Sequence, residues 1–514
     1  MKVNRRDSFK LFALAGTAAC ALAPPPAAAR TSQSVVLDNG LRAHLIPRQC
    51  GYISLSLILR SKEIVHRHGL AHIMEHTSFS GAAGSLAARD VAEAQRDCLQ
   101  DCNASTGLGV LRWDASFLPR HLPQVLSLLS DITLNQKFDT ETVAREANIV
   151  LQELYLEKYK ADVRQQRMFE VALYGETHPH VERTLDAEIA TAKLPAATLA
   201  ARLRDYAASL RLPANMDLFM VGQFEPDEVG RVIDQHFGKC AHARGPHLDL
   251  PAVGVTRCYR PLAGTAHELK RPLSELVIGW NTGVTATDPD AKTLVALCEY
   301  LKDVLFKQLR EQHGDTYTPE VAYQPDACSG IINITLPSSK HPAAVEQRAL
   351  QSMQSLKVDL NAREATRLRD RSELQRRKIV CRPEAQVDCM VRKAIDGASV
   401  DEMEPETVSR DELLAPPASI CPRTKGPTCA WCSEGASRQA KAASVCTVTR
   451  LHQPTALPVM GVMAIDFISC LPAAEDAAAK CRARVCKTAR DASLVFSPPM
   501  KNLGTTMLLV FARE

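Results

Sequence analysis

The sequence lacks a long basic run, a large excess of either charge and, beyond its first residues, any apolar stretch long enough to cross a membrane. Its 62 Lys and Arg residues nearly balance 58 Asp and Glu residues, so the formal net charge is only +4. This balance argues against nucleic acid as the main partner. The absence of a long apolar stretch argues against a membrane span. With 514 residues, the chain is long enough for two or more domains, each with its own core.

Residues 1–29 have the pattern of an export signal. Lys2, Arg5 and Arg6 give a positive start, residues 11–23 are apolar but too short to span a bilayer, and residues 27–29 are three alanines. The arginine pair is typical of a twin-arginine signal, and an ordinary secretory signal fits as well. We therefore expect an exported protein that resides in the periplasm.

The stretch RHGLAHIMEHTSFSGAAG, residues 67–84, holds His72, Glu75 and His76 in the order H-x-x-E-H. On a helix, side chains four residues apart project from the same face. Two histidines so placed can bind one metal ion, and Glu75 lies close enough to that face to hold and deprotonate a water on the metal. By itself the motif is an incomplete site.

A second predicted helix supplies two carboxylates. Asp139 is placed to cap a helix that begins at residue 140, and acidic residues in its first turn suit the helix dipole. Within this helix Glu146 and Glu153 are seven residues apart, about two turns, and so nearly share a face. An unpaired buried charge is costly, so both carboxylates are expected to have partners.

The rest of the first half shows strand and helix patterns. Asn39-Gly40, between apolar residues 35–37 and 41–46, predicts a hairpin. Apolar residues alternate with smaller or polar ones over 53–59, as in a half-buried strand. We further expect a helix over 85–99, strand over 106–118 and a helix with one buried face over 122–132.

The spacing of these motifs resembles the zinc site of the pitrilysin and insulinase family of metallopeptidases, peptidase family M16. The H-x-x-E-H sequence is followed by 76 intervening residues (153 − 76 − 1) and then Glu153. The surrounding sequence also matches, in DNGLRAHLIP, HGLAH, REANIVLQEL and YAASLRLPANMDLFMVGQFEPDEV. The likeness spans roughly residues 35–395.

By position, the resemblance implies that His72, His76 and Glu153 bind one Zn²⁺ per chain. Three protein ligands leave a fourth position for water, as a catalytic zinc requires. Glu75 would be the general base that activates this water and passes its proton to the leaving amine. The motif is the inverse of the commoner H-E-x-x-H.

The resemblance also assigns residues outside the ligand set. Glu146 matches the family's second glutamate. The resemblance implies that it supports catalysis together with Glu75, by orienting one of the metal ligands. A helix-stabilising charge is the alternative for Glu146. Asn103 and Ala104 would lie on an edge strand that binds the substrate backbone in extended form. For Asn103, an ordinary turn residue is the alternative.

The segment LREQHGDTY, residues 309–317, resembles the part of the family in which an arginine and a tyrosine reach the substrate. By position these are Arg310 and Tyr317. A guanidinium and a phenol can donate hydrogen bonds to a peptide carbonyl or to the oxyanion of a tetrahedral intermediate. The alternative is a surface arginine on a helix and a tyrosine on a strand.

The second half repeats the order of elements without H-x-x-E-H. After a Pro- and Gly-rich stretch at 245–255, residues 276–280 predict a strand, and Asp288 is placed to cap a long helix that ends near Gln312. Two more strands are expected within 317–336, and helices from about 342 and 361. We therefore predict an α+β protein with two homologous domains, residues 30–245 and 256–400, each an antiparallel-rich sheet packed with helices. Only the first carries metal.

Residues 401–514 depart from this pattern and are rich in Ala, Pro and Cys. Without the signal, sixteen of the seventeen cysteines remain, which permits disulfides in an oxidising compartment but leaves their pairing open. The alternative for most of these cysteines is that they are unpaired and pack in the core as small hydrophobic side chains. Cys429 and Cys432 form a C-x-x-C without a second pair at ribbon spacing, so an independent metal or redox module is a further alternative.

Together these observations predict an exported zinc metalloendopeptidase that cleaves peptides or unfolded polypeptide segments. The rival hypothesis is a non-catalytic or partner-dependent subunit that binds polypeptide and supports an active chain. The resemblance implies that the chain pairs with a second copy or a related chain to close its chamber. Glu75 and the three ligands favour the enzyme, because a supporting subunit has no need to retain them.

Overall fold

The computed structural model describes residues 32–99, 101–182, 184–239, 245, 248–253, 260–266, 274–338, 342–354, 361–400 and 446–452. All of these residues except His452 belong to one compact unit. The predicted export signal and the Cys429 and Cys432 pair lie outside the described residues. Among the helices described, none is both long and apolar enough to cross a membrane.

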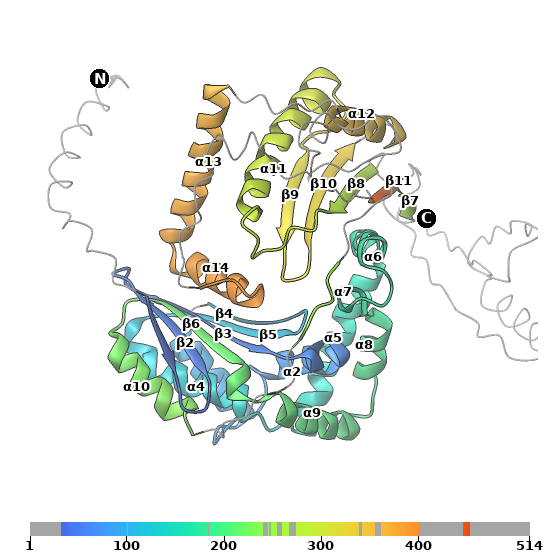
Figure 1. Cartoon of the computed structure of the whole chain (residues 1–514). Coiled ribbons are helices and arrows are strands. Elements are labelled where there is room, and N and C mark those ends of the chain that lie inside the picture. The colour runs from blue at the N-terminus through green and yellow to red at the C-terminus, as the bar shows by residue number, and fades with distance from the viewer. Residues whose placement is uncertain are drawn as a thin grey trace, which may run out of the picture. The chain divides into compact units, whose positions relative to one another are not determined.

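The first half combines one sheet with a set of helices (Figure 1). Its strands are β1 (Gln33–Val36), β2 (Arg42–Pro47), β3 (Ile53–Arg60), β4 (Asp101–Gly107), β5 (Val110–Phe117) and β6 (Met216–Gly222). Its helices are α1 (Lys62–His66), α2 (His68–Thr77), α3 (Ala88–Cys98), α4 (Leu122–Leu134), α5 (Thr140–Tyr159), α6 (Ala161–Tyr174), α7 (Pro179–Glu182), α8 (Leu185–Ala192), α9 (Ala196–Leu210) and α10 (Pro226–Phe237). The six strands are ordered β1-β2-β6-β3-β5-β4, antiparallel except for the parallel pair β2 and β6.

The predicted hairpin between β1 and β2 is confirmed. Gly40 has a φ of 90°, a conformation that glycine adopts without the steric penalty of a Cβ. The side-chain amide of Asn39 donates a hydrogen bond of 2.6 Å to the carbonyl of Phe237, at the end of α10. The turn is therefore fixed both by its own backbone and by a helix from the far end of this half.

The helix prediction at Asp139 is also confirmed. Asp139 caps α5, because its side chain accepts a hydrogen bond of 2.8 Å from the backbone N–H of Thr142. The helix then runs for 20 residues, far enough to carry both Glu146 and Glu153.

The prediction that residues 53–59 form a half-buried strand was wrong in one respect. All of β3 except Arg60 is buried, so both faces of the strand are covered. Leu55 and Leu57 face the main core, whereas Ile58 packs on the other face with Val387 and Met390. These two residues belong to α14 (Pro383–Ile395), which lies along the first sheet in Figure 1. The strand's own sequence does not identify so distant a partner.

The strand expected over 106–118 is in fact parts of two strands of a hairpin, the end of the first arm and the whole of the second, β5. Its first arm, β4, begins at Asp101, and Gly109 makes the turn into β5 with a φ of 68°. The order of the sheet places β4 at its edge. One of its backbone edges is therefore unpaired within this sheet, which is the requirement for binding an extended peptide as an added strand.

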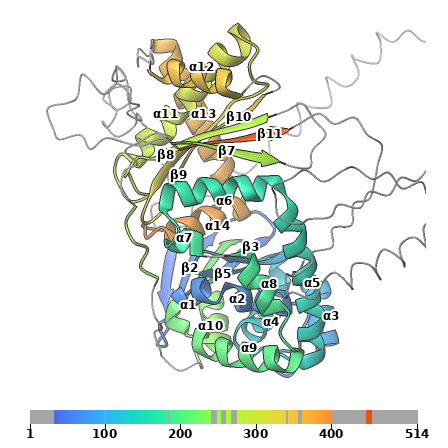
Figure 2. The same cartoon turned by 90° about the vertical axis from the view of Figure 1, so that its right-hand side faces the viewer.

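The second half has its own sheet and helices (Figure 2). Its elements are β7 (Arg260–Ala266), β8 (Ser274–Asn281), α11 (Ala291–Leu305), β9 (Glu320–Pro325), β10 (Gly330–Ser338), α12 (Pro342–Gln354), α13 (Ala362–Val380), α14 and β11 (Cys446–His452). The strands are ordered β7-β11-β8-β10-β9. β11 comes from the predicted tail and pairs antiparallel with β8, so this segment contributes to the second sheet. The α+β class is thus confirmed.

One helix start in the second half was predicted at the wrong residue. Asp288 does not cap α11; its carboxylate accepts hydrogen bonds from the backbone and hydroxyl of Thr285, within the preceding turn. The helix starts at Ala291 and passes at Phe306 into a π-helical segment that ends at Gln312. An Asp two or three residues early forms a local turn as readily as a cap.

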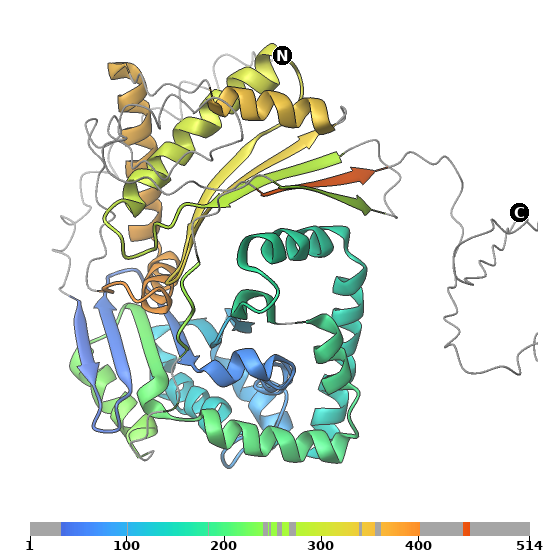
Figure 3. The ribbon, with the colours of Figure 1, turned by 45° about the vertical axis from the view of Figure 1, so that its right-hand side comes forward.

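Helix α6 of the first half packs against the second sheet, as Figure 3 also shows. Phe169 and Leu173 of α6 form a small apolar cluster with Val277 of β8 and Ile331 of β10. Gln165, one turn earlier, donates a hydrogen bond of 3.2 Å to the carbonyl of Glu275. Each half therefore lends a helix, α6 or α14, to the sheet of the other.

Candidate metal centre and active site

Helix α2 carries His72, Glu75 and His76, the three residues of the H-x-x-E-H motif. Its opposite side is anchored by Ile73 and Met74, which are fully buried in the main core. The two histidine rings lie side by side, with centroids 5.0 Å apart and planes at 68°. Burial of the apolar face thus fixes the direction in which both imidazoles point.

Glu153 of α5 meets both histidines at one point. Its Oε2 lies 3.5 Å from Nε2 of His72 and 3.4 Å from Nε2 of His76. The three ligand atoms lie within 4.8 Å of one another. Two nitrogens and one carboxylate oxygen are a donor set that zinc accepts in catalytic sites. The residues present therefore fit a zinc ion, with Glu153, whose side chain is 46% exposed, on the solvent side.

A buried carboxylate stands behind each of the two histidines. Nδ1 of His72 lies 3.3 Å from Oε2 of Glu188, on α8, and Nδ1 of His76 lies 3.7 Å from Oε2 of Glu146. Glu188 is 2% exposed and Glu146 is 5% exposed. Carboxylates in this position orient a ligand histidine and direct its other nitrogen to the metal.

Gly69 explains how α8 comes close enough to α2. A Cβ at this position would lie 3.0 Å from Cβ of Thr191 and 3.2 Å from Cα of Glu188. A larger residue would therefore push α8 outward and carry Glu188 away from His72. The glycine of the matched segment HGLAH has a packing role that its sequence does not reveal.

The pKa of His72 reflects these surroundings. Burial by itself would lower it, but the hydrogen bond with Glu188 and the negative charges of Glu75, Glu188 and Glu153 raise the pKa of His72 above its ordinary value. A cation bound at Nε2 would replace the proton and satisfy the same carboxylates. The excess of negative charge is thus what a metal site requires.

Glu75 contacts the edge strand of the sheet. Its Oε2 accepts a hydrogen bond of 2.5 Å from the hydroxyl of Thr106, on β4. Burial raises the pKa of Glu75, and the hydrogen bond from Thr106 and the charges of His72 and His76 offset this only in part. A carboxylate with a raised pKa is better matched to a role as general base and acid near neutral pH.

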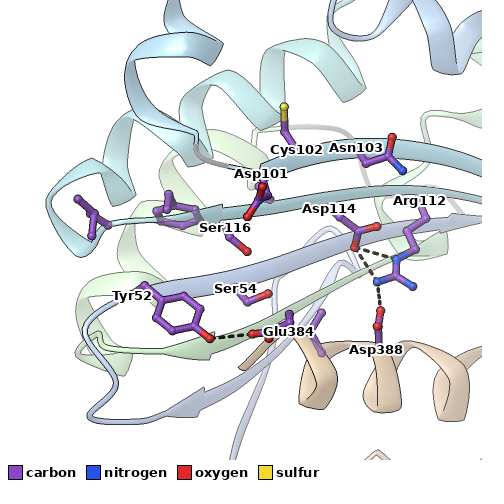
Figure 4. A pocket seen from close by; sticks show the side chains of 14 residues that line it. Tyr52, Ser54, Asp101, Cys102, Asn103, Arg112, Asp114, Ser116, Glu384 and Asp388 are labelled. Carbon is purple, nitrogen blue, oxygen red and sulfur yellow. Dashed lines mark hydrogen bonds and ion pairs between the residues drawn. The ribbon is translucent and has the colours of Figure 1, made fainter. Parts of the chain in front are cut away.

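Asn103 and Ala104 point to opposite sides of β4. Ala104 is buried in the core, on the same side as Thr106, whereas Asn103 pairs with Asp114 on the other side. There Asn103 lines a cavity of about 750 Å³ between the sheet and α14 (Figure 4). The cavity thus opens on the face of β4 opposite to the one from which Thr106 reaches Glu75.

Charged side chains from the sheet and from α14 meet in this cavity. Arg112 forms ion pairs with Asp114 and Asp388, and Tyr52 donates a hydrogen bond of 2.7 Å to Glu384. Asp388 and Glu384 belong to α14, so these polar contacts join the helix to the sheet. Burial, together with the hydrogen bond to Glu384, raises the pKa of Tyr52 to about 12.

Arg310 and Tyr317 lie against each other in the second half. The Arg310 guanidinium lies 4.8 Å from the ring centroid of Tyr317 and 4.8 Å from that of Phe306. Tyr317 is 76% exposed. Among the described residues, no hydrogen bond or ion pair joins this pair to the histidine cluster. The cation–π contacts keep the guanidinium beside an exposed phenol.

An H-x-x-E-H helix whose histidines meet a distant glutamate defines the inverted zincin class of metal site. A family model described as "Insulinase (Peptidase family M16)" matches residues 62–179, and one described as "Peptidase M16 inactive domain" matches residues 198–371. The two models match in succession along the chain. The chain belongs to the pitrilysin and insulinase family, M16.

Individual relatives are distant. An uncharacterized zinc protease of Mycobacterium leprae is 25% identical over 269 residues, which are 52% of this chain and 59% of that protein. The chain therefore spans less than two thirds of this relative. A protease from Helicobacter pylori superposes with a TM-score of 0.66 at 14% identity, over 82% of this chain and 99% of that one. The periplasmic protease PqqL from Escherichia coli has a TM-score of 0.62 at 14% identity, over 94% of this chain and 53% of that one.

Two residues of the site were not identified from the sequence. Glu188 lies 35 residues beyond Glu153, in a segment without a motif, and only the close approach permitted by Gly69 brings it to His72. Thr106 stands within the predicted strand, and only the register of β4 shows that it faces Glu75. In the sequence itself, no signal distinguishes either residue from its neighbours.

Proposed function

We propose that this protein is a zinc-dependent endopeptidase that hydrolyses peptides or unfolded polypeptide segments. The observation that carries this proposal is the meeting of His72, His76 and Glu153 at one point, with Glu75 beside them on the same helix. When bound, zinc supplies a Lewis acid that lowers the pKa of water at the fourth position. One ion per chain is expected at this site.

The side chains divide the work of the reaction. Glu75 takes a proton from the attacking water and gives it to the leaving amine. Because Thr106 engages Oε2, the proton is held at Oε1. Glu188 and Glu146 keep the two ligand histidines oriented, each from behind.

The substrate is expected to bind as an extended strand along β4. The position of β4 at the edge of its sheet supports this mode, in which main-chain hydrogen bonds supply most of the affinity. Asn103 and Ala104 would then lie next to the substrate backbone. Arg310 and Tyr317 are proposed to contact the substrate from the second half.

The proposal extends to a partner chain that pairs with this one. The match to PqqL covers 53% of that longer protein, which supports pairing of this chain with a second copy or a related chain. PqqL is described as periplasmic, which supports export of this chain to the same compartment. The second candidate function, a supporting subunit without activity of its own, is favoured by the model that describes residues 198–371 as an inactive domain.

Metal removal and restoration test the proposal. The protein, alone and with candidate partner chains, is incubated with a mixed peptide pool, and products are identified by mass spectrometry. Cleavage is expected to stop after chelation and to return on addition of zinc. Zinc-independent cleavage would contradict the mechanism. Zinc binding without cleavage, in every pairing, would favour the supporting subunit.

A further inference from the structure

A second group of metal-ligating side chains includes no residue of the candidate active site. His180 lies on α7, and Asp326 and Cys328 lie in the turn between β9 and β10. One donor atom from each residue lies within 4.8 Å of the other two. The group therefore joins a short helix of the first half to a turn of the second.

The geometry resembles a chelate rather than a catalytic triad. Nε2 of His180 lies 3.0 Å from Oδ2 of Asp326 and 4.0 Å from Sγ of Cys328. A nucleophilic relay needs the cysteine and the carboxylate on different ring nitrogens, whereas here both approach the same one.

These separations also suit a common cation. Tetrahedral zinc, with bond lengths of about 2.0–2.3 Å, places nitrogen and oxygen ligands about 3.4 Å apart and nitrogen and sulfur ligands about 3.6 Å apart. The observed distances, 3.0 Å and 4.0 Å, each differ from these values by about 0.4 Å. A small rotation of a side chain removes such a difference.

Asp326 is held in place by its own turn. Its Oδ1 accepts hydrogen bonds from the backbone N–H groups of Cys328, at 2.8 Å, and Ser329, at 2.5 Å. The hydroxyl of Ser329 donates a further bond of 2.9 Å to Oδ2. Carboxylates that bind metals are commonly hydrogen-bonded in this way, which fixes the direction of the remaining lone pairs.

The ring of His180 is held by stacking. It lies parallel to the ring of Tyr174, with centroids 4.3 Å apart, and next to the ring of His178, at 5.3 Å. Both nitrogens of His178 have partners, because Nε2 lies 3.0 Å from the carbonyl of Pro251 and Nδ1 accepts from the backbone of His180. Of the two histidines, His180 is the one that faces the aspartate and the cysteine.

We propose that His180, Asp326 and Cys328 bind a divalent cation of the zinc type that clips α7 to the turn between β9 and β10. A nitrogen, an oxygen and a sulfur donor suit zinc, whereas calcium and magnesium require oxygen ligands. On binding, the thiol of Cys328 releases its proton to solvent, and His180 binds through a neutral ring. The side chains of His180 and Asp326 are 22% and 23% exposed, which leaves an entry path.

The expected effect of the clip is on stability. His180 and Cys328 are 148 residues apart, so the cation closes a long loop and restricts the unfolded chain. Without a cation, the contact between α7 and the turn consists of the approach of His180 Nε2 to Asp326 Oδ2, at 3.0 Å.

Cobalt substitution separates these two states. The full chain, with its cysteines reduced, is titrated with Co²⁺, and the thiolate-to-cobalt charge-transfer absorption is recorded. The candidate active site has no sulfur ligand, so this absorption reports only a site that contains cysteine. We expect the band in wild type, its loss in Cys328→Ser and its retention in Cys298→Ser, a matched change at another buried cysteine. A band that is absent from wild type, or unchanged in Cys328→Ser, overturns the proposal.

Two further variants keep the result interpretable. His180→Asn alters a partly exposed ligand, and its cobalt affinity is expected to fall roughly 100-fold or more, since loss of even an outer partner costs about 10–100-fold. Wild-type affinity in a folded His180→Asn protein overturns the proposal. Cys429→Ser is expected to keep the band, and its loss there would assign the sulfur to the C-terminal region instead.

Discussion

Nδ1 of His72 lies 3.3 Å from Oε2 of Glu188, a carboxylate that is 2% exposed. The other nitrogen, Nε2, faces Glu153 at 3.5 Å. A carboxylate behind a histidine holds the proton at Nδ1 and leaves the lone pair of Nε2 for a metal. Glu188 thereby orients the first ligand histidine, although its helix, α8, carries no recognisable motif.

Glu188→Gln is expected to weaken zinc binding about 10–100-fold, the usual effect of losing an outer partner of a ligand histidine. The change keeps the shape of the side chain and removes its charge. Competition with a chromogenic chelator measures the affinity. Glu182→Gln is the matched control, because Glu182 also contacts a histidine, His66, but its side chain is 44% exposed and outside the site. Equal affinities for Glu188→Gln and wild type would contradict the assigned role.

Thr106→Val is expected to lower kcat about 10- to 100-fold, because a hydrogen bond to a charged group contributes about 1.5–3 kcal/mol. Thr106 is a positioning residue that acts through Glu75, so KM and zinc content should stay near their wild-type values. Thr106→Ser, which restores the hydroxyl, should recover most of the rate. Loss of zinc, or failure of the serine variant to recover, would indicate a structural role instead.

The buried carboxylate of Asp217, on β6, makes the free energy of unfolding depend on pH in the acid range. It accepts hydrogen bonds from Arg42, at 2.8 Å, and Arg60, at 2.9 Å. Burial by itself would raise the pKa of Asp217, but hydrogen bonds with His44 and Arg42 and the charges of both arginines hold it well below its usual range. Since the folded pKa is the lower one, this stabilisation is complete above the unfolded value of about 3.9 and is lost as the pH falls through the folded value.

Asp217→Asn is therefore expected to lower the free energy of unfolding at pH 7 by about 3 kcal/mol and to flatten its decline below about pH 4. Urea unfolding at pH 7 and at a pH below about 4 measures both effects. Asp388→Asn is the control, because its side chain, paired with Arg112, is 52% exposed and should contribute less than about 1 kcal/mol. A pH profile of Asp217→Asn that parallels wild type would refute the account.

Gly222→Ala is expected to lower the free energy of unfolding by about 1–3 kcal/mol or more. Gly222 ends β6 with a φ of +150°, and a Cβ there would lie 2.4 Å from the carbonyl oxygen of Tyr52. Gly230→Ala, on α10, is the matched control, since nothing lies within 4 Å of its Cβ. In that helix alanine should raise stability by up to about 1 kcal/mol. Urea midpoints that shift equally in both variants would contradict this reasoning.

Features that depend on local sequence pattern or on fixed residue spacing could be predicted from the sequence. Asn39-Gly40 determines a hairpin and Asp139 determines the start of α5, because both act on their own backbone. His72 and His76 share a face because a helix imposes it. Glu153 was identified only through the family resemblance, since its distance from the histidines depends on how α5 packs.

Features that depend on distant contacts were not predictable in this way. The alternating sequence of β3 predicts one buried face, but α14 covers the second face as well. Glu188 belongs to the site only because α8 packs closely against Gly69, and the sequence does not show this contact. Asp288 was mistaken for a cap because turns and helix starts use the same residues. β11, which pairs with β8, lies within residues 401–514, which depart from the pattern of the two predicted domains.

The central claim is that His72, His76 and Glu153 hold zinc while Glu75 moves the proton. Its most direct test measures zinc content and peptide cleavage on the same preparations of wild type and Glu75→Gln, alone or paired as wild type requires. We predict equal zinc content and a loss of cleavage of about 100-fold or more in the variant, since a positioned acid–base contributes about 10²–10⁴-fold. Equal cleavage by the two proteins, with zinc retained in both, would contradict the account.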